Sequence, residues 1–480
     1  ILGLRGPEPG QLNIPSQSNR GPSLRDPGRL PLLVAVVSLV TVVAFESLAI
    51  STVMPIVESD LGEIQLYGWV FSSFYIGTLI GVVVGGNAVD RIKPIGPMMV
   101  GVAIFMAGLL IGGFAPSMEV LVAGRLLQGL GAGVVPAVSY VAVARGFPES
   151  LHPKVFAAMS TAWIMPALIS PLLASIIAKH VGWRWVFLGL IPITAVVAAI
   201  GAPAVSKVDG SPKRLAGSTE VGRTSPVQTV MVLAIAATMT LVGLGLENPF
   251  VALPLAAVGL AAMVPAFRRL TPPGTLTARP RLPAAILIRG LLTFAFFSSD
   301  AFLSLAVTSV RHRTTTYAGM ALVGSSVAWT VGSWVQARYL SIGTPGRWKS
   351  THLVRTGGLL LLAGASGMVA SLSQRVPIGM WVASSATMGL GMGLAYTTIS
   401  VVTLSEAEEG SEGSATSSMQ MSDILGIALG TGLAGVMVSI GDRFDAANAT
   451  ALAGVFASSA AMALLVAALA PRLSKPLSPL

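Results

Sequence analysis

The chain has 480 residues, 53% of them hydrophobic and only 10% charged, with a formal net charge of +10. Apolar runs of about 20 residues, the length a helix needs to cross a bilayer, recur along it and exclude an ordinary soluble domain. It has no cysteine, and its four histidines are scattered near segment ends or in loops, which argues against disulfide bonds and metal sites. We therefore predict an all-α polytopic membrane protein without metal or cofactor.

Residues 1–29 are polar, with repeated Gly, Pro and Ser and four arginines. They lack the apolar core and the small-residue cleavage site of a signal peptide. We expect this segment to be a disordered cytoplasmic tail.

Fourteen apolar runs follow the tail. In chain order they are 30–53, 68–89, 97–115, 118–144, 155–178, 184–205, 227–246, 249–267, 284–308, 317–338, 352–372, 377–403, 415–440 and 449–470. We predict an N-terminal six-helix bundle at 30–205, cytoplasmic linkers and two extra crossings at 206–283, a C-terminal six-helix bundle at 284–470 and a cytoplasmic tail at 471–480.

The distribution of basic residues predicts the orientation. With the N-terminus in the cytoplasm and 14 crossings, 22 of the 30 Lys and Arg residues fall on the inner side and six on the outer side. Because positive charge is retained on the cytoplasmic side, we expect both termini to face the cytoplasm of a cell-membrane protein. The positive charge is thereby accounted for without a nucleic-acid partner.

Three ionisable residues share one level of the predicted membrane interior. Glu46, Arg125 and Asp300 each lie about seven residues from the outer end of a crossing, roughly 10 Å deep. Charges at this depth are costly and mark ion pathways or pairs. If the first and fourth crossings are neighbours, Glu46 and Arg125 can pair or exchange a proton. Gln128 lies one turn from Arg125 on the same face, and we assign it to the substrate cavity.

Structural roles stay open for these charges. Arg125 can merely neutralise Glu46, and Asp300 can face water in an outer cavity without coupling. Arg289 and Asp423 lie near the cytoplasmic ends of two outward-running crossings, where we favour a structural ion pair. Glycines also recur at helical spacing, as at Gly389 and Gly393, which permits close helix packing.

Three local patterns point to one family. Glu46 precedes Pro55 by nine positions, the fourth run reads LVAGRLLQGLGAG around Arg125 and Gln128, and Gly182–Ile193 reads GWRWVFLGLIPI. Together they resemble the major facilitator superfamily, specifically its fourteen-helix drug:proton antiporter branch, over nearly all of residues 30–470. The resemblance implies that Arg125 tunes protonation of the Glu46 carboxylate. It also matches GWRWVF to the branch's Trp-Arg-Trp-x-Phe signature.

The loop after the second crossing matches the family in part. It reads GNAVDRIKPIGPMM and keeps Gly86, Asp90 and Arg91, whereas Lys93 replaces the expected Gly. The resemblance implies a conformational latch between the bundle halves, and we group Asp423 with it.

The fifth crossing carries a reduced form of the antiporter motif. PALISPLLAS keeps Pro171, with Ser170 among its small substitutes for glycine. A faint internal repeat supports the two-bundle plan, because Glu46 and Asp300 have equivalent depths in the first crossing of each half. Such repeats place substrate and ion sites near the midplane at their interface.

We predict a proton-coupled secondary transporter, a monomer that exports small lipophilic or amphipathic compounds by alternating access. No GxxxxGK[ST] motif occurs, so the energy comes from an ion gradient. A dedicated metabolite or lipid transporter of the same fold stays open. An intramembrane enzyme is disfavoured, since no Cys or intramembrane His supplies a nucleophile and base. A non-transporting sensor would need a signalling domain, for which the extramembrane segments are too short.

Overall fold

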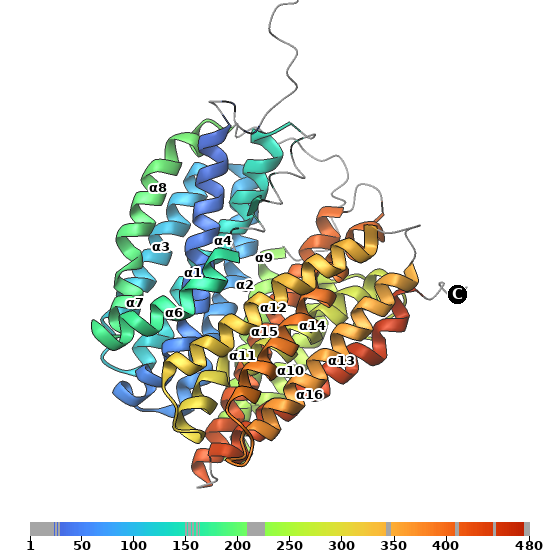
Figure 1. The fold of residues 1–480 in the computed structure, drawn as a ribbon. Helices are drawn as coiled ribbons and strands as arrows, with labels where there is room; N and C mark the ends of the chain where they lie inside the picture. Colours follow the sequence, from blue (N-terminus) through green and yellow to red (C-terminus); the bar gives the residue numbers. More distant parts are fainter. Residues whose placement is uncertain are drawn as a thin grey trace, which may run out of the picture.

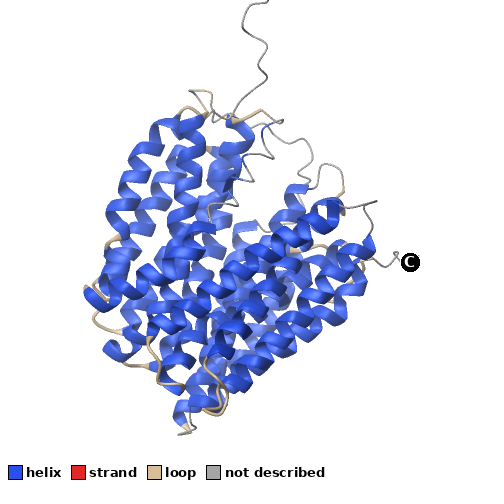
Figure 2. Cartoon of the chain, viewed as in Figure 1, coloured by secondary structure: helices blue, strands red, loops and turns tan. Residues whose placement is uncertain are grey.

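The computed structural model describes residues 24, 26, 29–148, 151, 155, 158–159, 162, 164–208, 226–341, 347–408, 412–444 and 448–474. Within these ranges it consists of helices and loops and contains no strand, which confirms the predicted all-α class (Figure 2). The predicted disordered tail and most of the linker after residue 205 lie outside the described residues.

The helices follow the apolar runs closely. The first group comprises α1 (Leu30–Leu61), a 3-10 turn (Ile64–Leu66), α2 (Tyr67–Arg91), α3 (Ile95–Gly113), α4 (Met118–Gly146), α6 (Ile164–His180), α7 (Arg184–Leu188) and α8 (Leu190–Ser206). Next come α9 (Pro226–Gly245) and α10 (Pro249–Leu270). The last group comprises α11 (Leu282–Leu305) with a π-helical turn (Ala306–Val310), α12 (Thr315–Ser341), α13 (Arg347–Ser371), α14 (Gly379–Ser405), α15 (Glu412–Arg443), α16 (Asn448–Leu469) and a final 3-10 turn (Ala470–Leu473).

The predicted number of 14 crossings is not confirmed. In the described part of the chain, 13 helices are long and apolar enough to cross a membrane. The difference lies at the predicted fifth crossing, 155–178, several residues of which lie outside the described ranges. The helix described there is α6, with 17 residues, and it begins directly after a residue that lies outside the described ranges.

The helices form two groups that meet along a seam (Figure 1). In the first group α2 and α3 pack on α4, and α6 and α8 pack on α1. In the second, α12 and α13 pack on α14, and α15 and α16 pack on α11. Contacts of α1 with α11, α2 with α15 and α6 with α12 join the groups, while α9 packs on both α2 and α15 and carries α10. The predicted domain boundaries themselves stay predictions.

Glycines allow equivalent helices of the two groups to approach closely. A Cβ at Gly129 of α4 would overlap the backbone oxygen of Phe74 on α2, and a Cβ at Gly389 of α14 would overlap that of Ser325 on α12. The α2–α4 and α12–α14 contacts are therefore built alike, as expected for small residues at membrane helix interfaces.

Gly389→Ala is expected to destabilise the protein by about 1–3 kcal/mol, because the added methyl group forces α12 and α14 apart. Thermal unfolding of the purified protein in detergent measures the change. Gly379→Ala on the same helix is the control, since a Cβ there has no atom within 4 Å. Equal unfolding temperatures for the two variants would contradict this account of the packing.

The two groups touch at the end of the molecule where α1 finishes. Gly68 of α2 lies against Gly435 of α15, and the Ser72 hydroxyl contacts the Ala428 carbonyl oxygen at 3.0 Å. Further out, Gln65 Nε2 donates to Asp442 Oδ2 at 2.7 Å. Toward the end where α1 begins, the helices of the two groups diverge (Figure 1).

Candidate functional site

A buried ion pair joins α1 to α4. The Glu46 and Arg125 side chains are 2% and 1% exposed, and Arg125 Nη1 donates to Glu46 Oε1. The same nitrogen donates to Gln128 Oε1 at 2.5 Å, and Arg125 Nε donates to the Val70 carbonyl oxygen of α2 at 3.0 Å. The guanidinium also lies 4.3 Å from the centre of the Phe74 ring. One arginine thus links three helices around a buried carboxylate.

The pair leaves two polar atoms unused. Glu46 Oε2 and Gln128 Nε2 are buried and have no hydrogen-bond partner among the described residues. Twelve buried side-chain polar atoms in the described residues lack a partner, and Glu46 Oε2 is the carboxylate oxygen among them. An oxygen of this kind can accept a proton while the other oxygen still accepts from Arg125.

A second pair lies in the other group of helices. Arg289 of α11 bonds both carboxylate oxygens of Asp423 on α15, at 2.9 and 3.4 Å. Its Nη1 donates to the Tyr396 carbonyl oxygen of α14 at 2.7 Å and to Ser400 Oγ at 3.1 Å. The Tyr396 hydroxyl in turn donates to Asp423 at 3.1 Å. These contacts fasten α11, α14 and α15 together, as the predicted structural pair would.

Asp300 stands apart from both pairs. It has no hydrogen-bond or ion-pair partner among the described residues, and the structure does not bring it against Glu46 or Arg125. The neighbouring Ser298 and Ser299 hydroxyls bond Ser459 of α16, at 2.6 and 2.8 Å, rather than the carboxylate. Asp300 is therefore a half-buried, unpaired acid on α11.

A row of aromatic rings connects the two pairs. From Phe74, beside Arg125, ring centres follow at 5.3 Å to Tyr75, 6.3 Å to Phe297, 6.4 Å to Trp329 and 5.3 Å to Tyr396, beside Arg289. The step from Tyr75 to Phe297 crosses from α2 to α11.

This row of rings was not predicted from the sequence. Its signal is the presence of Tyr75, Trp329 and Tyr396 well inside apolar runs, whereas Trp and Tyr in membrane helices concentrate at the interfaces.

The reduced antiporter motif lies at the seam. The Pro171 backbone of α6 faces Gly319 of α12, and the Ser175 and Thr315 hydroxyls are 3.4 Å apart. The Ser170 hydroxyl is buried without a partner in the described ranges. The motif is thus placed where α6 and α12 would move against each other.

The predicted latch residues Gly86, Asp90 and Arg91 lie in the last two turns of α2, and their role as a latch stays a prediction. Gly86 has open space around its Cβ position, Arg91 ends α2 and is exposed, and the side chain of Asp90 lies outside the described residues. Among the described residues, the hydrogen bonds of the Asp423 side chain are to Arg289 of α11 and Tyr396 of α14.

The GWRWVF signature ties the C-terminal end of α1 to the N-terminal end of α7. Trp183 Nε1 and Arg184 Nη1 both donate to Asp60 Oδ2, at 2.9 and 2.8 Å. Arg184 also donates to the Ala115 carbonyl oxygen at 3.3 Å and stacks on the Trp183 ring. The signature therefore fixes the loop geometry of the first group.

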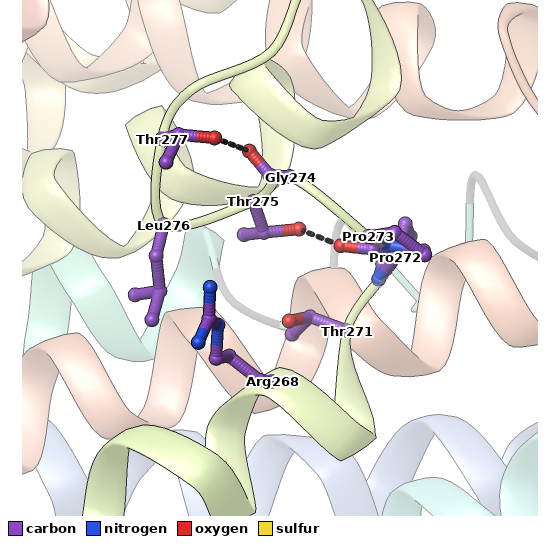
Figure 3. Close-up of a pocket in the computed structure, with 8 residues that line it drawn as sticks. All are labelled: Arg268, Thr271, Pro272, Pro273, Gly274, Thr275, Leu276 and Thr277. Atoms are coloured by element: carbon purple, nitrogen blue, oxygen red, sulfur yellow. Dashed lines mark hydrogen bonds between the residues drawn. The ribbon is translucent and has the colours of Figure 1, made fainter.

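A separate pocket of about 230 Å³ lies in the loop between α10 and α11, lined by Arg268 and residues 271–277 (Figure 3). The loop is held by hydrogen bonds from Thr275 to the Pro272 carbonyl oxygen and from Thr277 to the Gly274 carbonyl oxygen. Arg472 Nη1 donates to the Thr277 and Ala278 carbonyl oxygens. This is a braced turn whose pocket is lined by no member of either ion pair.

No group of three His, Asp or Glu side chains suited to a metal occurs in the described ranges.

The family model and the related proteins that match this chain are all of membrane transporters. The family model "Major Facilitator Superfamily" matches residues 36–431. The chain is 28% identical over 436 residues to the "Probable multidrug-efflux transporter Rv1634" of Mycobacterium tuberculosis, covering 88% of this chain and 90% of that protein. A stretch of 175 residues, 36% of this chain and 39% of that protein, is 29% identical to "Multidrug efflux pump SdrM" of Staphylococcus aureus.

Solved structures share the fold. An auto-inhibited POT family peptide transporter superposes with a TM-score of 0.66 at 18% identity, over 93% of this chain and 98% of that one. A D-xylose–proton symporter superposes with a TM-score of 0.64 at 13% identity, over the same shares. At these identities the similarity shows the fold alone.

Proposed function

The chain belongs to the major facilitator superfamily, and on that premise we propose that it exports lipophilic or amphipathic compounds in exchange for protons, by alternating access. It is a multi-pass membrane protein of all-α fold. The names of the relatives support efflux of small molecules. A relative that matches 88% of this chain and one that matches 36% of it are both named as multidrug efflux proteins.

The observation that carries the proposal is the buried Glu46–Arg125 pair with its unused oxygen. An ionisable pair inside a membrane is costly, and such groups mark proton or substrate pathways. Glu46 Oε2 lacks a partner, so the carboxyl can take up a proton without first leaving Arg125. We assign Glu46 and Arg125 as the proton-coupling pair, with Gln128 at the edge of the substrate cavity.

The proposal assigns roles to two further sets of residues. Asp300 is the second carboxylate of the coupling set, and Gly86, Asp90 and Arg91 form the latch on the cytoplasmic side. Asp423 belongs instead with Arg289, because every contact it makes lies within one group of helices.

We assign the chain to the fourteen-helix drug:proton antiporter branch. The helices α9 and α10, which lie between the two groups in sequence and pack at their seam, support this assignment. The shorter α6 would then be the fourteenth crossing, so that both termini face the cytoplasm as the basic residues favour. The contacts between the groups lie within one chain, and we propose that a monomer is the working unit.

Transport driven by an imposed proton gradient tests the function. Inside-out vesicles with an acidic lumen and no ATP are expected to accumulate ethidium, and a protonophore should abolish the accumulation. Accumulation that survives the protonophore would contradict proton coupling. If ethidium and other lipophilic cations are not accumulated by folded protein, the alternative, a dedicated metabolite or lipid transporter, takes precedence.

A further inference from the structure

The loop between α10 and α11 carries positive charge that the protein does not balance. Residues 248–299 contain no Asp or Glu, yet four arginines lie at the end of α10 and in the loop: Arg268, Arg269, Arg279 and Arg281. Arg281 lies 3.6 Å from the Glu406 carboxylate at the end of α14. The other three arginines form no ion pair with a described residue. Their charge is therefore available to an anion from outside the protein.

This loop lies at the membrane boundary, beside lipid. Arg443 of α15 donates to the Gly245 carbonyl oxygen, so α10 begins at the end of the molecule where α1 finishes. With 22 residues, or about 33 Å, α10 crosses the bilayer, and the loop follows at the opposite end. Among the 13 candidate spans in the described part of the chain, α10 is the least buried, with 17% of its most apolar stretch covered by protein. Its exposed face therefore meets lipid chains, and the loop after it lies level with phospholipid headgroups.

The pocket in this loop has room and donors for an anionic group. Its volume of about 230 Å³ is several times the roughly 30 Å³ share of a water molecule. The Arg268 side chain lines it, reaching from α10 toward the loop (Figure 3). Arg279 packs on the lining residue Gly274, since a Cβ there would overlap the Arg279 side chain. The threonine hydroxyls of the pocket donate to carbonyl oxygens of the protein, so the arginines supply the donors.

Arginine at a membrane boundary suits one class of ligand. Its planar guanidinium presents a fork of N–H donors that matches the oxygens of a phosphate group. Basic pockets beside membrane helices attract the headgroups of anionic lipids. We propose that this pocket binds the phosphate group of an anionic phospholipid whose acyl chains lie along α10. Arg268 donates to the phosphate oxygens, and Arg279 adds a second positive charge.

The site goes beyond the proposed function, because it involves neither the exported compound nor the coupling pair. In the proposed orientation it faces the cytoplasmic leaflet. The loop joins α10 to α11, the first helix of the second group, so a bound headgroup would hold this junction at the membrane surface.

Lipid binding to the full chain tests the site. The protein in dodecyl maltoside, a detergent without phosphate, is titrated with phosphatidylglycerol or with zwitterionic phosphatidylcholine, and native mass spectrometry counts the bound lipids. The first phosphatidylglycerol is expected to bind about tenfold more tightly than phosphatidylcholine. Arg268→Gln should weaken its binding about fivefold or more, and Arg268→Gln with Arg279→Gln should remove the preference for the anionic lipid.

Arg269→Gln is the matched control. It removes the same charge from the adjacent position, which does not line the pocket, and both side chains are exposed, so neither change should impair folding. We expect it to weaken phosphatidylglycerol binding by less than about twofold. Equal losses in Arg268→Gln and Arg269→Gln would overturn the proposal, because net charge alone would then attract the lipid. Equal affinity of the wild type for the two lipids would also overturn it.

Inorganic phosphate distinguishes the source of the phosphate group. Added in excess, it should leave the bound phosphatidylglycerol in place, because the lipid is also held by its acyl chains along α10. If inorganic phosphate displaces the lipid from the wild type, the pocket takes a soluble phosphate and the lipid assignment is wrong. Lipid binding needs no proton gradient, so a failure of proton coupling in vesicles, with this binding intact, contradicts the proposed function alone.

Discussion

Glu46→Gln is expected to abolish gradient-driven accumulation of ethidium in inside-out vesicles and also to destabilise the protein. The neutral amide cannot exchange a proton, and the buried charge of Arg125 then has no negative partner, only neutral contacts with Gln128, the Val70 carbonyl oxygen and the Phe74 ring among those the structure shows. Breaking a buried ion pair on one side costs about 3–5 kcal/mol. Accumulation and thermal unfolding of the same preparation measure the two effects.

The double variant Glu46→Gln with Arg125→Gln separates coupling from stability. It removes both charges, so we expect it to unfold at a higher temperature than Glu46→Gln alone, because no uncompensated charge stays buried. We still expect no accumulation driven by the proton gradient. Should the double variant transport as the wild type does, the pair is a static support and its coupling role is refuted.

A bridge between the 3-10 turn before α2 and the C-terminal end of α15 is expected to stop transport almost completely. The chain contains no cysteine, so Gln65→Cys with Asp442→Cys introduces the only two thiols. The native side chains are in hydrogen-bond contact at 2.7 Å, which puts the new thiols within reach of a short, reducible bis-methanethiosulfonate reagent. Alternating access requires the groups to part at this end, so the bridge should trap the observed arrangement, and reduction should restore ethidium accumulation.

The matched control is Asp60→Cys with Arg184→Cys. Arg184 Nη1 and Asp60 Oδ2 are 2.8 Å apart, at the end of the molecule where α1 finishes, but both residues belong to the first group of helices. The same reagent should leave accumulation largely intact in this variant. Transport that continues through a verified Gln65–Asp442 bridge would show that the seam does not open there.

The arrangement of charges could be predicted from the sequence because depth is a one-dimensional property. Counting residues from helix ends placed Glu46 and Arg125 at one level and Arg289 and Asp423 at another, and both pairs form in the structure. The same count gives Asp300 the depth of Glu46 in the other group of helices, and its part in proton coupling stays a prediction. Level alone does not report which face a side chain occupies.

The end of α1 and the row of aromatic rings are two features that could not be predicted from the sequence. The predicted first crossing stopped at Val53, yet α1 continues through Pro55 to Leu61, because the helix tolerates the one backbone donor that proline removes. The row unites rings from α2, α11, α12 and α14, whose order in space depends on how the two groups pack. No local pattern contains that information.

Substrate-driven proton movement tests the central claim most directly. Inside-out vesicles with an acidic lumen and a trapped pH-sensitive dye receive ethidium, and the dye reports luminal pH for the wild type and for the Glu46→Gln, Arg125→Gln double variant. We predict that ethidium makes the lumen of wild-type vesicles less acidic and leaves that of the double variant unchanged. A pH change of the same size in both would contradict the assignment of Glu46 and Arg125 as the coupling pair, and none in either would contradict proton exchange itself.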